Sequence, residues 1–399
     1  MIKIMIPSFN FASIPHIIFG PGVITQLFDI ITKFGKNVLF VIGEKSLKKS
    51  GKWSEIIKNL EINSINYSYV SVSGEPSPTL VDSVVNQYRD KKPDLVVGIG
   101  GGSVTDAGKA ISAMMLKKDT IKNYLEGVGT KKHDGKKIPF IAIPTTSGTG
   151  SEATKNAVIS EIGSEGFKKS LRHDNLVPNY SVIDPELIIS CPPSVTAACG
   201  MDAFTQLLEA YTSNKSTPMT DSLAYSGMKY MKDAIIPAYT TGHSDMNVRS
   251  SMAYGSLMSG ICLANAGLGI IHGLASPIGG FFEMPHGVIC GTLLAESTRM
   301  NIEKLKELGA SGKQALQKYA HVGALFDINK CFNATKIDYY CSLLIKVLES
   351  WTSELNIDLL GKYGIQEDDI ERIVNITRLK NNPVSLTKED IRKILGNRI

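Results

Sequence analysis

The sequence lacks a strong excess of charge of either sign. Its 399 residues carry 43 basic and 38 acidic side chains, which gives a formal net charge of +5 at pH 7. The densest basic run, KKHDGKK at 131–137, is surrounded by acidic residues and turn formers, so we interpret it as a solvated loop. A protein that binds nucleic acid concentrates positive charge far more than this. We therefore expect no nucleic-acid partner.

The sequence also lacks an unbroken apolar stretch long enough to span a membrane. The apolar N-terminal segment, residues 1–20, is interrupted by Pro7 and Pro15. No long apolar core followed by a small-residue cleavage site is found there. These absences predict neither a signal peptide nor a membrane span, and we expect a cytoplasmic protein.

Cysteine is scarce, and no pair has the Cys-x-x-Cys spacing. Several cysteines stand in apolar stretches with helical periodicity, which favours buried thiols in a reducing compartment over a disulfide framework or a zinc knuckle. The six are Cys191, Cys199, Cys262, Cys290, Cys331 and Cys341.

The first half of the chain alternates short β-branched runs with helical stretches. Strands are predicted at 37–43, 94–100, 138–145 and 181–188, and helices at roughly 46–60, 79–91 and 104–116. Runs that are apolar throughout suit strands buried on both faces of a parallel sheet. The pattern predicts an α/β domain with a doubly wound, mostly parallel sheet.

Beyond residue 190 strand-like runs almost vanish and helical periodicity dominates. Because 399 residues exceed what one core usually holds, we predict two domains, 1–190 and 191–399, the second all-helical. Near the end of the chain, Thr387 and Asp390 have the spacing of a capping box that opens the last helix.

Glycines end the second predicted strand and open the following helix. Gly100, Gly101, Gly102 and Ser103 occupy this junction, where a helix N-terminus offers free N–H groups to a phosphate. A tight turn without a ligand is the alternative reading. The placement between strand and helix favours a phosphate site in the first domain.

A second polar, glycine-rich loop, residues 144–155, follows the next strand and contains Thr145, Thr146 and Thr149. Ligands of open α/β sheets bind beyond the carboxyl ends of the strands, although such loops can also be merely solvated. Glu44 follows the strand at 37–43, where an acidic side chain accepts from a ribose 2′-hydroxyl and repels a 2′-phosphate. This favours NAD, with NADP as the alternative.

Two histidines in the helical half, His272 and His286, flank a glycine-rich turn. Asp202 and Gln206 are four residues apart and share one face of a predicted helix. Each residue alone has an ordinary explanation. Asp202 could simply interact with the helix dipole, and the amide and the two histidines could be hydrogen-bonded residues of the core. Two imidazoles and a carboxylate together suit a divalent metal with an open position, which is the pattern of a catalytic centre.

Seven motifs in order make the chain resemble the iron-containing (group III) alcohol dehydrogenases over nearly its full length. They are IIFGPGVITQL (17–27), GGGSVTDAGKAI (100–111), PTTSGTGSEAT (144–154), DPELI (184–188), GMDAFTQLLEAYTS (200–213), NAGLGIIHGLASPIGGFFEMPHG (265–287) and LTKEDIRKIL (386–395). The resemblance implies the dehydroquinate synthase-like fold, with the active site in the cleft between the two domains.

The resemblance also implies roles for individual residues. The usual metal set of the family is one aspartate and three histidines. Asp202, His272 and His286 match three of these, while Gln206 stands at the first histidine position as a weak fourth ligand for Fe²⁺ or Zn²⁺. A further histidine common in the family is Ser276 here. Asp106 and Lys168 match positions near the nucleotide.

These residues predict a metal-dependent NAD(P) alcohol dehydrogenase or aldehyde reductase, in which the metal polarises the substrate oxygen and hydride passes to or from nicotinamide. Ala275, Pro277, Phe281 and Phe282 are expected to face the cleft and favour a small alcohol or aldehyde. We expect a homodimer. The alternatives are a metal-independent reductase like the maleylacetate reductases, a lyase like dehydroquinate synthase, and a nucleotide-binding module without catalysis.

Overall fold

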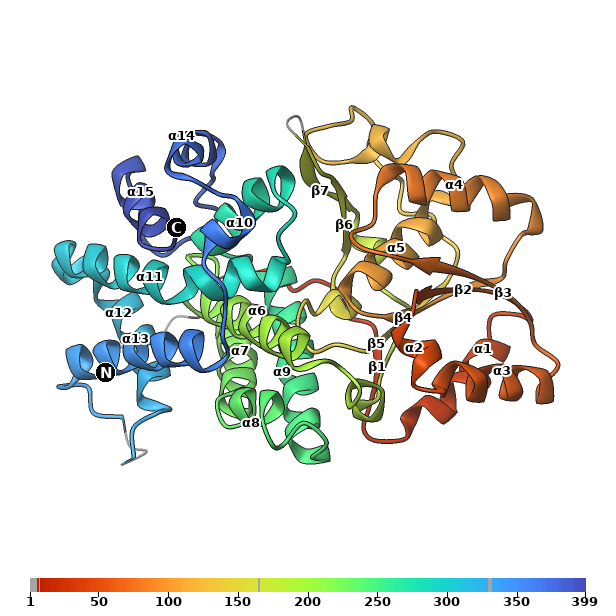
Figure 1. The fold of residues 1–399 in the computed structure, drawn as a ribbon, viewed down its shortest axis with the longest axis horizontal. Helices are drawn as coiled ribbons and strands as arrows, with labels where there is room; N and C mark the ends of the chain where they lie inside the picture. Colours follow the sequence, from red (N-terminus) through yellow and green to blue (C-terminus); the bar gives the residue numbers. More distant parts are fainter. Residues whose placement is uncertain (1–5, 7, 164–165, 329–331) are drawn as a thin grey trace.

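The computed structural model describes residues 6, 8–163, 166–328 and 332–399. Figure 1 shows two halves side by side, a sheet flanked by helices and a bundle made of helices. The last strand of the large sheet ends at Ile183 and helix α6 begins at Pro193, so the change of architecture falls in the connection between them.

A six-stranded parallel sheet forms the N-terminal half, with strand order β1-β8-β5-β4-β2-β3. The chain crosses from β3 over to β4 on the other side of β2, which is the doubly wound topology that the sequence predicts. The strands are β1 (His16–Phe19), β2 (Asn37–Gly43), β3 (Asn66–Val72), β4 (Leu95–Gly100), β5 (Phe140–Pro144) and β8 (Tyr180–Ile183).

Helices cover both faces of this sheet (Figure 1). Alternate residues of β2 point to opposite sides: Leu39 packs in a cluster with side chains of α4 and α5, and Phe40 in a cluster with side chains of α1 and α3. The helices are α1 (Leu27–Thr32), α2 (Ser46–Lys49), α3 (Lys52–Ile62), α4 (Pro78–Tyr88) and α5 (Gly102–Met114). The α/β class predicted from continuous apolar runs is therefore confirmed.

Helices are the regular elements among the described residues of the C-terminal half, and they pack around one large apolar core. The predicted capping box is confirmed: Thr387 Oγ1 accepts from the backbone N–H of Asp390, whose carboxylate accepts from the N–H of Thr387 at 2.9 Å. The helices are α6 (Pro193–Thr212), α7 (Pro218–Met231), α8 (Ile235–Tyr239), α9 (Met246–Ala266), α10 (Ile270–Phe281), α11 (His286–Glu307), α12 (Lys313–Ala324), α13 (Ile337–Glu354), α14 (Glu367–Ile376) and α15 (Lys388–Gly396).

An antiparallel hairpin, β6 (Asn156–Glu161) and β7 (Phe167–Arg172), lies where the two halves meet (Figure 1). Strand β7 packs beside α10, and the N–H of Gly163 donates to the carbonyl of Gly280 at 3.4 Å. Neither this hairpin nor strands β1 and β3 were predicted from the sequence. The hairpin brings side chains of the first half up to the helix that carries His272.

The two halves also touch at a second point, where the backbone of the loop after β5 meets the backbone of α9. Gly150, in the loop after β5, has a φ of +60°, and a Cβ on Gly260 of α9 would lie 2.1 Å from the Gly150 carbonyl oxygen. No side chain fits between the loop and the helix at this distance. The loop after β5 is thereby held against the helical half.

Within the described residues, no single helix combines the length and the apolar character needed to cross a membrane. One pair of helices, Met246–Ala266 and Ile270–Phe281, is long and apolar enough when the two are taken together, but the chain bends by 99° between them.

Candidate metal and nucleotide site

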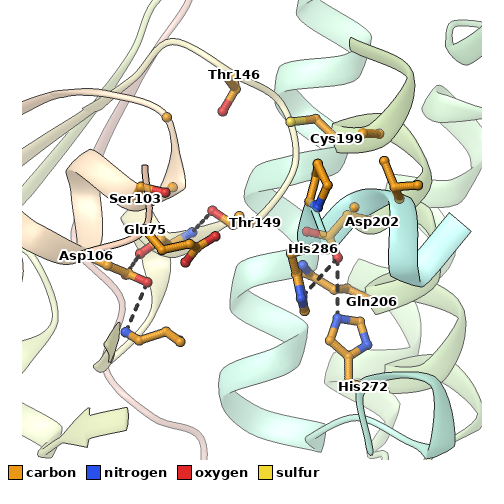
Figure 2. Close-up of a pocket in the computed structure, with 18 of the residues that line it drawn as sticks. Glu75, Ser103, Asp106, Thr146, Thr149, Cys199, Asp202, Gln206, His272 and His286 are labelled. Carbon is orange, nitrogen blue, oxygen red and sulfur yellow. Dashed lines mark hydrogen bonds and ion pairs between the residues drawn. The ribbon is translucent and has the colours of Figure 1, made fainter. Parts of the chain in front are cut away.

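A cavity of about 940 Å³ opens between the two halves and is lined by residues from both. Figure 2 shows Ser103, Asp106 and Thr149 on the α/β side, facing Asp202, His272 and His286 on the helical side. One space therefore joins the predicted phosphate loops to the predicted metal ligands.

The N-terminus of α5 forms part of the cavity wall. Gly101 precedes the helix with an extended backbone and no side-chain cap, so the first N–H groups of α5 are free to meet an anion. A Cβ on Gly102 would lie 2.6 Å from Cγ2 of Thr149, so glycine lets the two predicted loops touch. This end of α5 can hold a pyrophosphate.

Asp106, on α5, holds the second glycine-rich loop, residues 144–155, by hydrogen bonding. Its carboxylate accepts from the Ser151 hydroxyl and from the Val158 N–H at 3.0 Å. Lys109, fully buried, donates to the backbone carbonyls of Ser151 at 2.8 Å and Asn156 at 2.7 Å. Burial lowers the pKa of Lys109 to about 8. This network fixes the loop that carries Thr146 and Thr149.

The structure brings together most of the residues predicted to hold the nucleotide. Lining the cavity are Gly101, Gly102, Ser103, Asp106, Thr146, Thr149 and Lys168. Glu44, Gly100 and Thr145 do not line it. The Glu44 side chain is half exposed after the end of β2, with a carboxylate oxygen 3.6 Å from Lys45 Nζ.

Lys168, on β7, reaches the cavity because the hairpin packs against α10. Its ammonium group lies 3.2 Å from a carboxylate oxygen of Glu75, which also lines the cavity. Glu75 was not predicted from the sequence, since it stands in a short loop after the unpredicted strand β3.

Asp202, His272 and His286 converge in the helical wall (Figure 2). Oδ1 of Asp202 lies 3.3 Å from Nε2 of His272 and 3.7 Å from Nε2 of His286. This oxygen is buried and has no well-aligned hydrogen bond within the described part of the chain. A buried carboxylate oxygen of this kind fits a cation between the three side chains.

Glu209, one turn further along α6 from Gln206, sets the orientation of His272. Its carboxylate accepts from Nδ1 of His272 at 2.7 Å and from the backbone N–H of Ile271 at 2.7 Å. Because Glu209 holds a proton on Nδ1, Nε2 is the nitrogen that faces Asp202 and would serve as the metal donor, as in carboxylate–histidine–metal arrangements. Glu209 was not predicted from the sequence.

Burial and charge set the protonation of these groups. Burial alone would raise the pKa of Asp202, but the two imidazoles outweigh it and lower that pKa to about 2. Burial lowers the pKa of His286 to about 3, so this imidazole is neutral. Burial would lower the pKa of His272 as well, but Cys290, Asp202 and Glu209 raise it well above the ordinary value. Metal binding at neutral pH therefore displaces a proton from His272.

Cys290 forms a cluster of four potential metal donors with Asp202, His272 and His286, and the donor atoms all lie within 4.8 Å of one another. From the sequence, this cysteine was expected only to be a buried thiol. The sequence did carry one sign of a role at the site. Cys290 stands four residues after His286 and therefore shares a helix face with it.

Gln206 and Ser276 both line the cavity. The carbonyl oxygen of Gln206 accepts from the Ser259 hydroxyl at 2.9 Å, and its side chain also hydrogen-bonds to Asp202. The Ser276 hydroxyl donates to the Lys168 carbonyl at 3.4 Å. Gln206 is thus placed to orient Asp202.

One expectation about the substrate wall is wrong. Ala275, Pro277, Phe281 and Phe282 do not line the cavity. Ala275 and Pro277 lie on the buried face of α10, and the Phe281 ring lies 3.6 Å from the Arg372 guanidinium. The helical period of α10 instead turns His272 and Ser276, four residues apart, toward the cavity.

The expectation for the cysteines holds in part. All five described cysteines are free thiols. Cys262, Cys290 and Cys341 are buried, whereas Cys191 and Cys199 are half-buried, and Cys199 lines the cavity. Cys331 lies outside the described residues.

Comparison with known sequences places both halves in one family. Residues 15–185 match the family model described as iron-containing alcohol dehydrogenase, and residues 196–399 match that of the C-terminal region of the Fe-containing alcohol dehydrogenase family. The chain belongs to the iron-containing alcohol dehydrogenase family. The resemblance seen in its motifs is confirmed, and the chain is an oxidoreductase.

Curated relatives are similar along almost the whole chain. The chain is 32% identical to long-chain-alcohol dehydrogenase 1 of Geobacillus thermodenitrificans, over 96% of each sequence. It is 27% identical to the NAD-dependent methanol dehydrogenase of Bacillus methanolicus, over 97% of this chain and 99% of that protein. It is 29% identical to the NADPH-dependent butanol dehydrogenase of Clostridium saccharobutylicum, over 95% of each.

A solved structure has the same fold. An archaeal halo-thermophilic alcohol dehydrogenase from a Red Sea brine pool superposes with a TM-score of 0.88 at 25% identity, over 99% of each chain.

Proposed function

We propose that this protein is a metal-dependent NAD(P) alcohol dehydrogenase or aldehyde reductase acting on a small alcohol or aldehyde. One observation carries the proposal: Asp202, His272 and His286 converge in the wall of the same cavity that the uncapped N-terminus of α5 enters. Residues 1–190 act as the nucleotide-binding domain, and residues 191–399 hold the metal and the substrate.

The helical half holds Fe²⁺ or Zn²⁺ through Asp202, His272 and His286. When bound, such an ion acts as a Lewis acid on the substrate oxygen and favours loss of the hydroxyl proton. Glu209 keeps the His272 imidazole in the ligand tautomer, and Gln206 orients Asp202. Gln206 has an orienting role here in place of the weak fourth ligand that the family pattern suggests.

The α/β half holds the nucleotide, which supplies or accepts the hydride. Gly101, Gly102 and Ser103 offer their N–H groups to the pyrophosphate, while Thr146 and Thr149 contribute hydroxyls from the facing loop. Glu44 favours NAD over NADP through its place after β2. Relatives named for NAD and for NADPH both exist, so each cofactor is tested.

A screen of alcohols and aldehydes tests the function. The purified protein is assayed with NAD(H) and NADP(H), once with Fe²⁺ and once with Zn²⁺ added. We expect reversible interconversion of an alcohol and its aldehyde, with the faster rate in NAD(H). Turnover that returns the nicotinamide unchanged would instead favour a lyase of the same fold, and full activity without metal would favour a metal-independent reductase.

His286→Ala tests the ligand assignment. We expect this variant to lose metal content together with activity, because one of the two imidazole donors is gone. Retention of the metal and of the full rate would show that the assignment is wrong. The homodimer and the cytoplasmic location stay predictions from the sequence.

A further inference from the structure

We propose that the thiolate of Cys290 is a protein ligand of the metal, so that the site is built from one carboxylate, two imidazoles and one sulfur. The proposal rests on the proposed function, since it specifies the donor set of the same site.

Four of the six separations between the donor atoms are close to those of a tetrahedral site. Sγ of Cys290 lies 3.7 Å from Nε2 of His272 and 3.7 Å from Nε2 of His286. Oδ1 of Asp202 lies 3.3 and 3.7 Å from the same two nitrogens. Zinc bonds of about 2.0–2.1 Å to nitrogen and oxygen and about 2.3 Å to sulfur, at tetrahedral angles, separate the donors by about 3.4–3.6 Å. These four separations therefore need to change by only a few tenths of an ångström, and all four donor atoms lie within 4.8 Å of one another.

Helix α11 presents Cys290 to the site. His286 is the first residue of α11, and Cys290 lies one turn later on the same face. A Cβ on Gly287 would lie 2.2 Å from the carbonyl oxygen of Ala198, so this turn packs directly against the backbone of α6, the helix that carries Asp202. The position of Sγ follows from this close packing of two helices.

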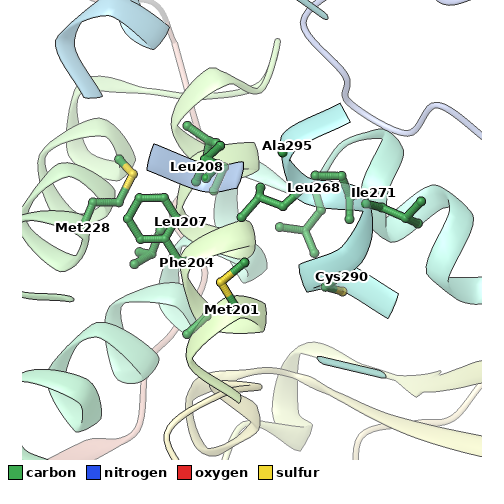
Figure 3. Close-up of a cluster of buried hydrophobic side chains, with 14 of the residues drawn as sticks. Met201, Phe204, Leu207, Leu208, Met228, Leu268, Ile271, Cys290 and Ala295 are labelled. Carbon is green, nitrogen blue, oxygen red and sulfur yellow. The ribbon is translucent and has the colours of Figure 1, made fainter. Parts of the chain in front are cut away.

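A thiol that merely fills space is the alternative. Figure 3 shows Cys290 at the edge of the apolar cluster that contains Met201, Leu268 and Ile271. The other buried thiols differ in their polar contacts: Sγ of Cys262 donates to the Thr220 carbonyl at 3.5 Å, and Sγ of Cys341 to the Leu316 carbonyl at 3.7 Å. Among the described cysteines, Cys290 is the one whose sulfur faces two imidazole nitrogens.

Gln206 is a poorer candidate for the same position. Its carbonyl oxygen accepts from the Ser259 hydroxyl at 2.9 Å, and its side chain also hydrogen-bonds to Asp202. Both ends of the Gln206 amide therefore already have partners in the protein.

A sulfur ligand changes which metals the site selects. Thiolate favours soft or borderline ions such as Zn²⁺ and Co²⁺ over Mg²⁺ and Mn²⁺. On binding, the Cys290 S–H bond is replaced by a sulfur–metal bond and the proton passes to the buffer, with no change of oxidation state. Zinc can expand its coordination to five, which leaves room for a substrate oxygen beside four protein donors.

Cobalt spectroscopy tests the proposal without an activity assay. The full-length protein is stripped of metal with a chelator, reloaded with one equivalent of Co²⁺, and examined by absorption. We expect an intense near-ultraviolet thiolate-to-cobalt charge-transfer band, together with the visible bands of tetrahedral cobalt. The charge-transfer band is expected to be absent in Cys290→Ala and retained in Cys262→Ala, a matched change of a buried thiol on α9.

Zinc affinity gives a second readout. Competition with a chromophoric chelator should show at least roughly 10-fold weaker Zn²⁺ binding in Cys290→Ala than in Cys262→Ala. If Cys290→Ala does not fold, as judged by circular dichroism, Cys290→Ser serves as the variant, and its charge-transfer band is likewise expected to vanish.

The possible failures are distinguishable. Tetrahedral cobalt bands without a charge-transfer band in the unaltered protein would overturn the Cys290 ligand and leave the proposed function standing. A charge-transfer band that survives in Cys290→Ala would assign the sulfur ligand to another cysteine. A protein that takes up none of Co²⁺, Zn²⁺ and Fe²⁺ would overturn both the ligand and the metal-dependent function.

Discussion

At the scale of single residues, the site depends on side chains that sequence reasoning recognised only in part. Asp202, His272 and His286 were predictable because carboxylate and imidazole are familiar metal donors. Glu209 and Cys290 carried signals in their helical spacing, seven residues after Asp202 and four after His286. Those signals acquire meaning only when α6, α10 and α11 are known to meet, which a single sequence does not reveal.

Glu209→Gln tests the orienting role of the carboxylate. The amide removes the charged acceptor at Nδ1 of His272, so we expect Zn²⁺ affinity to fall by roughly 10–100-fold, with the fold retained. Competition with a chromophoric chelator measures this. Glu307→Gln, an exposed position on the same helix as Cys290, should bind Zn²⁺ like the unaltered protein. Equal affinities in both variants would contradict the role of Glu209.

Glu152, in the loop after β5, makes the stability of the folded protein depend on pH. Burial raises the pKa of Glu152 from 4.5 to about 7 in the folded protein. Its protonated form therefore contributes stability that is fully present below pH 4.5 and is lost as the pH rises through about 7. The size of this term is on the order of 3 kcal/mol.

Thermal melts between pH 5 and pH 7 measure this effect. We expect Glu152→Gln to reduce the loss of Tm over this range, because the amide does not ionise. Exposed Glu61→Gln should keep the pH dependence of the unaltered protein. The same pH dependence in all three proteins would contradict burial as the cause.

At the scale of secondary structure, apolar runs predicted the buried strands β2, β4 and β5, since strands covered on both faces must be apolar throughout. Strand β3 (NYSYVSV) lies at the edge of the sheet, and most of its residues are partly or fully exposed. It was not predicted because it lacks a continuous apolar run. The hairpin β6–β7 was missed as well, because FKKSLR in β7 reads as a polar loop until its neighbour α10 is known. This hairpin places Lys168 at the cavity.

Gly260→Ala tests the contact that joins the loop after β5 to α9. The new Cβ would overlap the Gly150 carbonyl oxygen, at 2.1 Å, so the loop or the helix must shift. Overpacking of this kind costs about 1–3 kcal/mol or more. We expect a Tm several degrees lower and a raised KM for the nucleotide.

Gly396→Ala is the matched control, since a Cβ there meets nothing within 4 Å and the residue is helical. It should melt at or above the temperature of the unaltered protein. If Gly260→Ala and Gly396→Ala had the same Tm, the backbone contact between the loop and α9 would not be tight.

At the scale of the whole molecule, function requires both halves. The N-terminus of α5 and the ligand set of α6, α10 and α11 face each other across one cavity, and neither half contains both. The two-part architecture followed from the change of periodicity near residue 190. The composition of the substrate wall did not follow, because which face of α10 meets the cavity depends on the packing between the halves. The family match confirms the architecture and the enzyme class.

The central claim is that a metal held by Asp202, His272 and His286 is required for nicotinamide-dependent turnover. The most direct measurement is the metal content of the purified protein followed through chelation and reloading, with the rate of alcohol oxidation recorded at each stage. We expect the rate to fall in proportion to the metal removed and to return when Fe²⁺ or Zn²⁺ is restored to about one equivalent per chain. A metal-free protein that oxidises the alcohol at the full rate would contradict it.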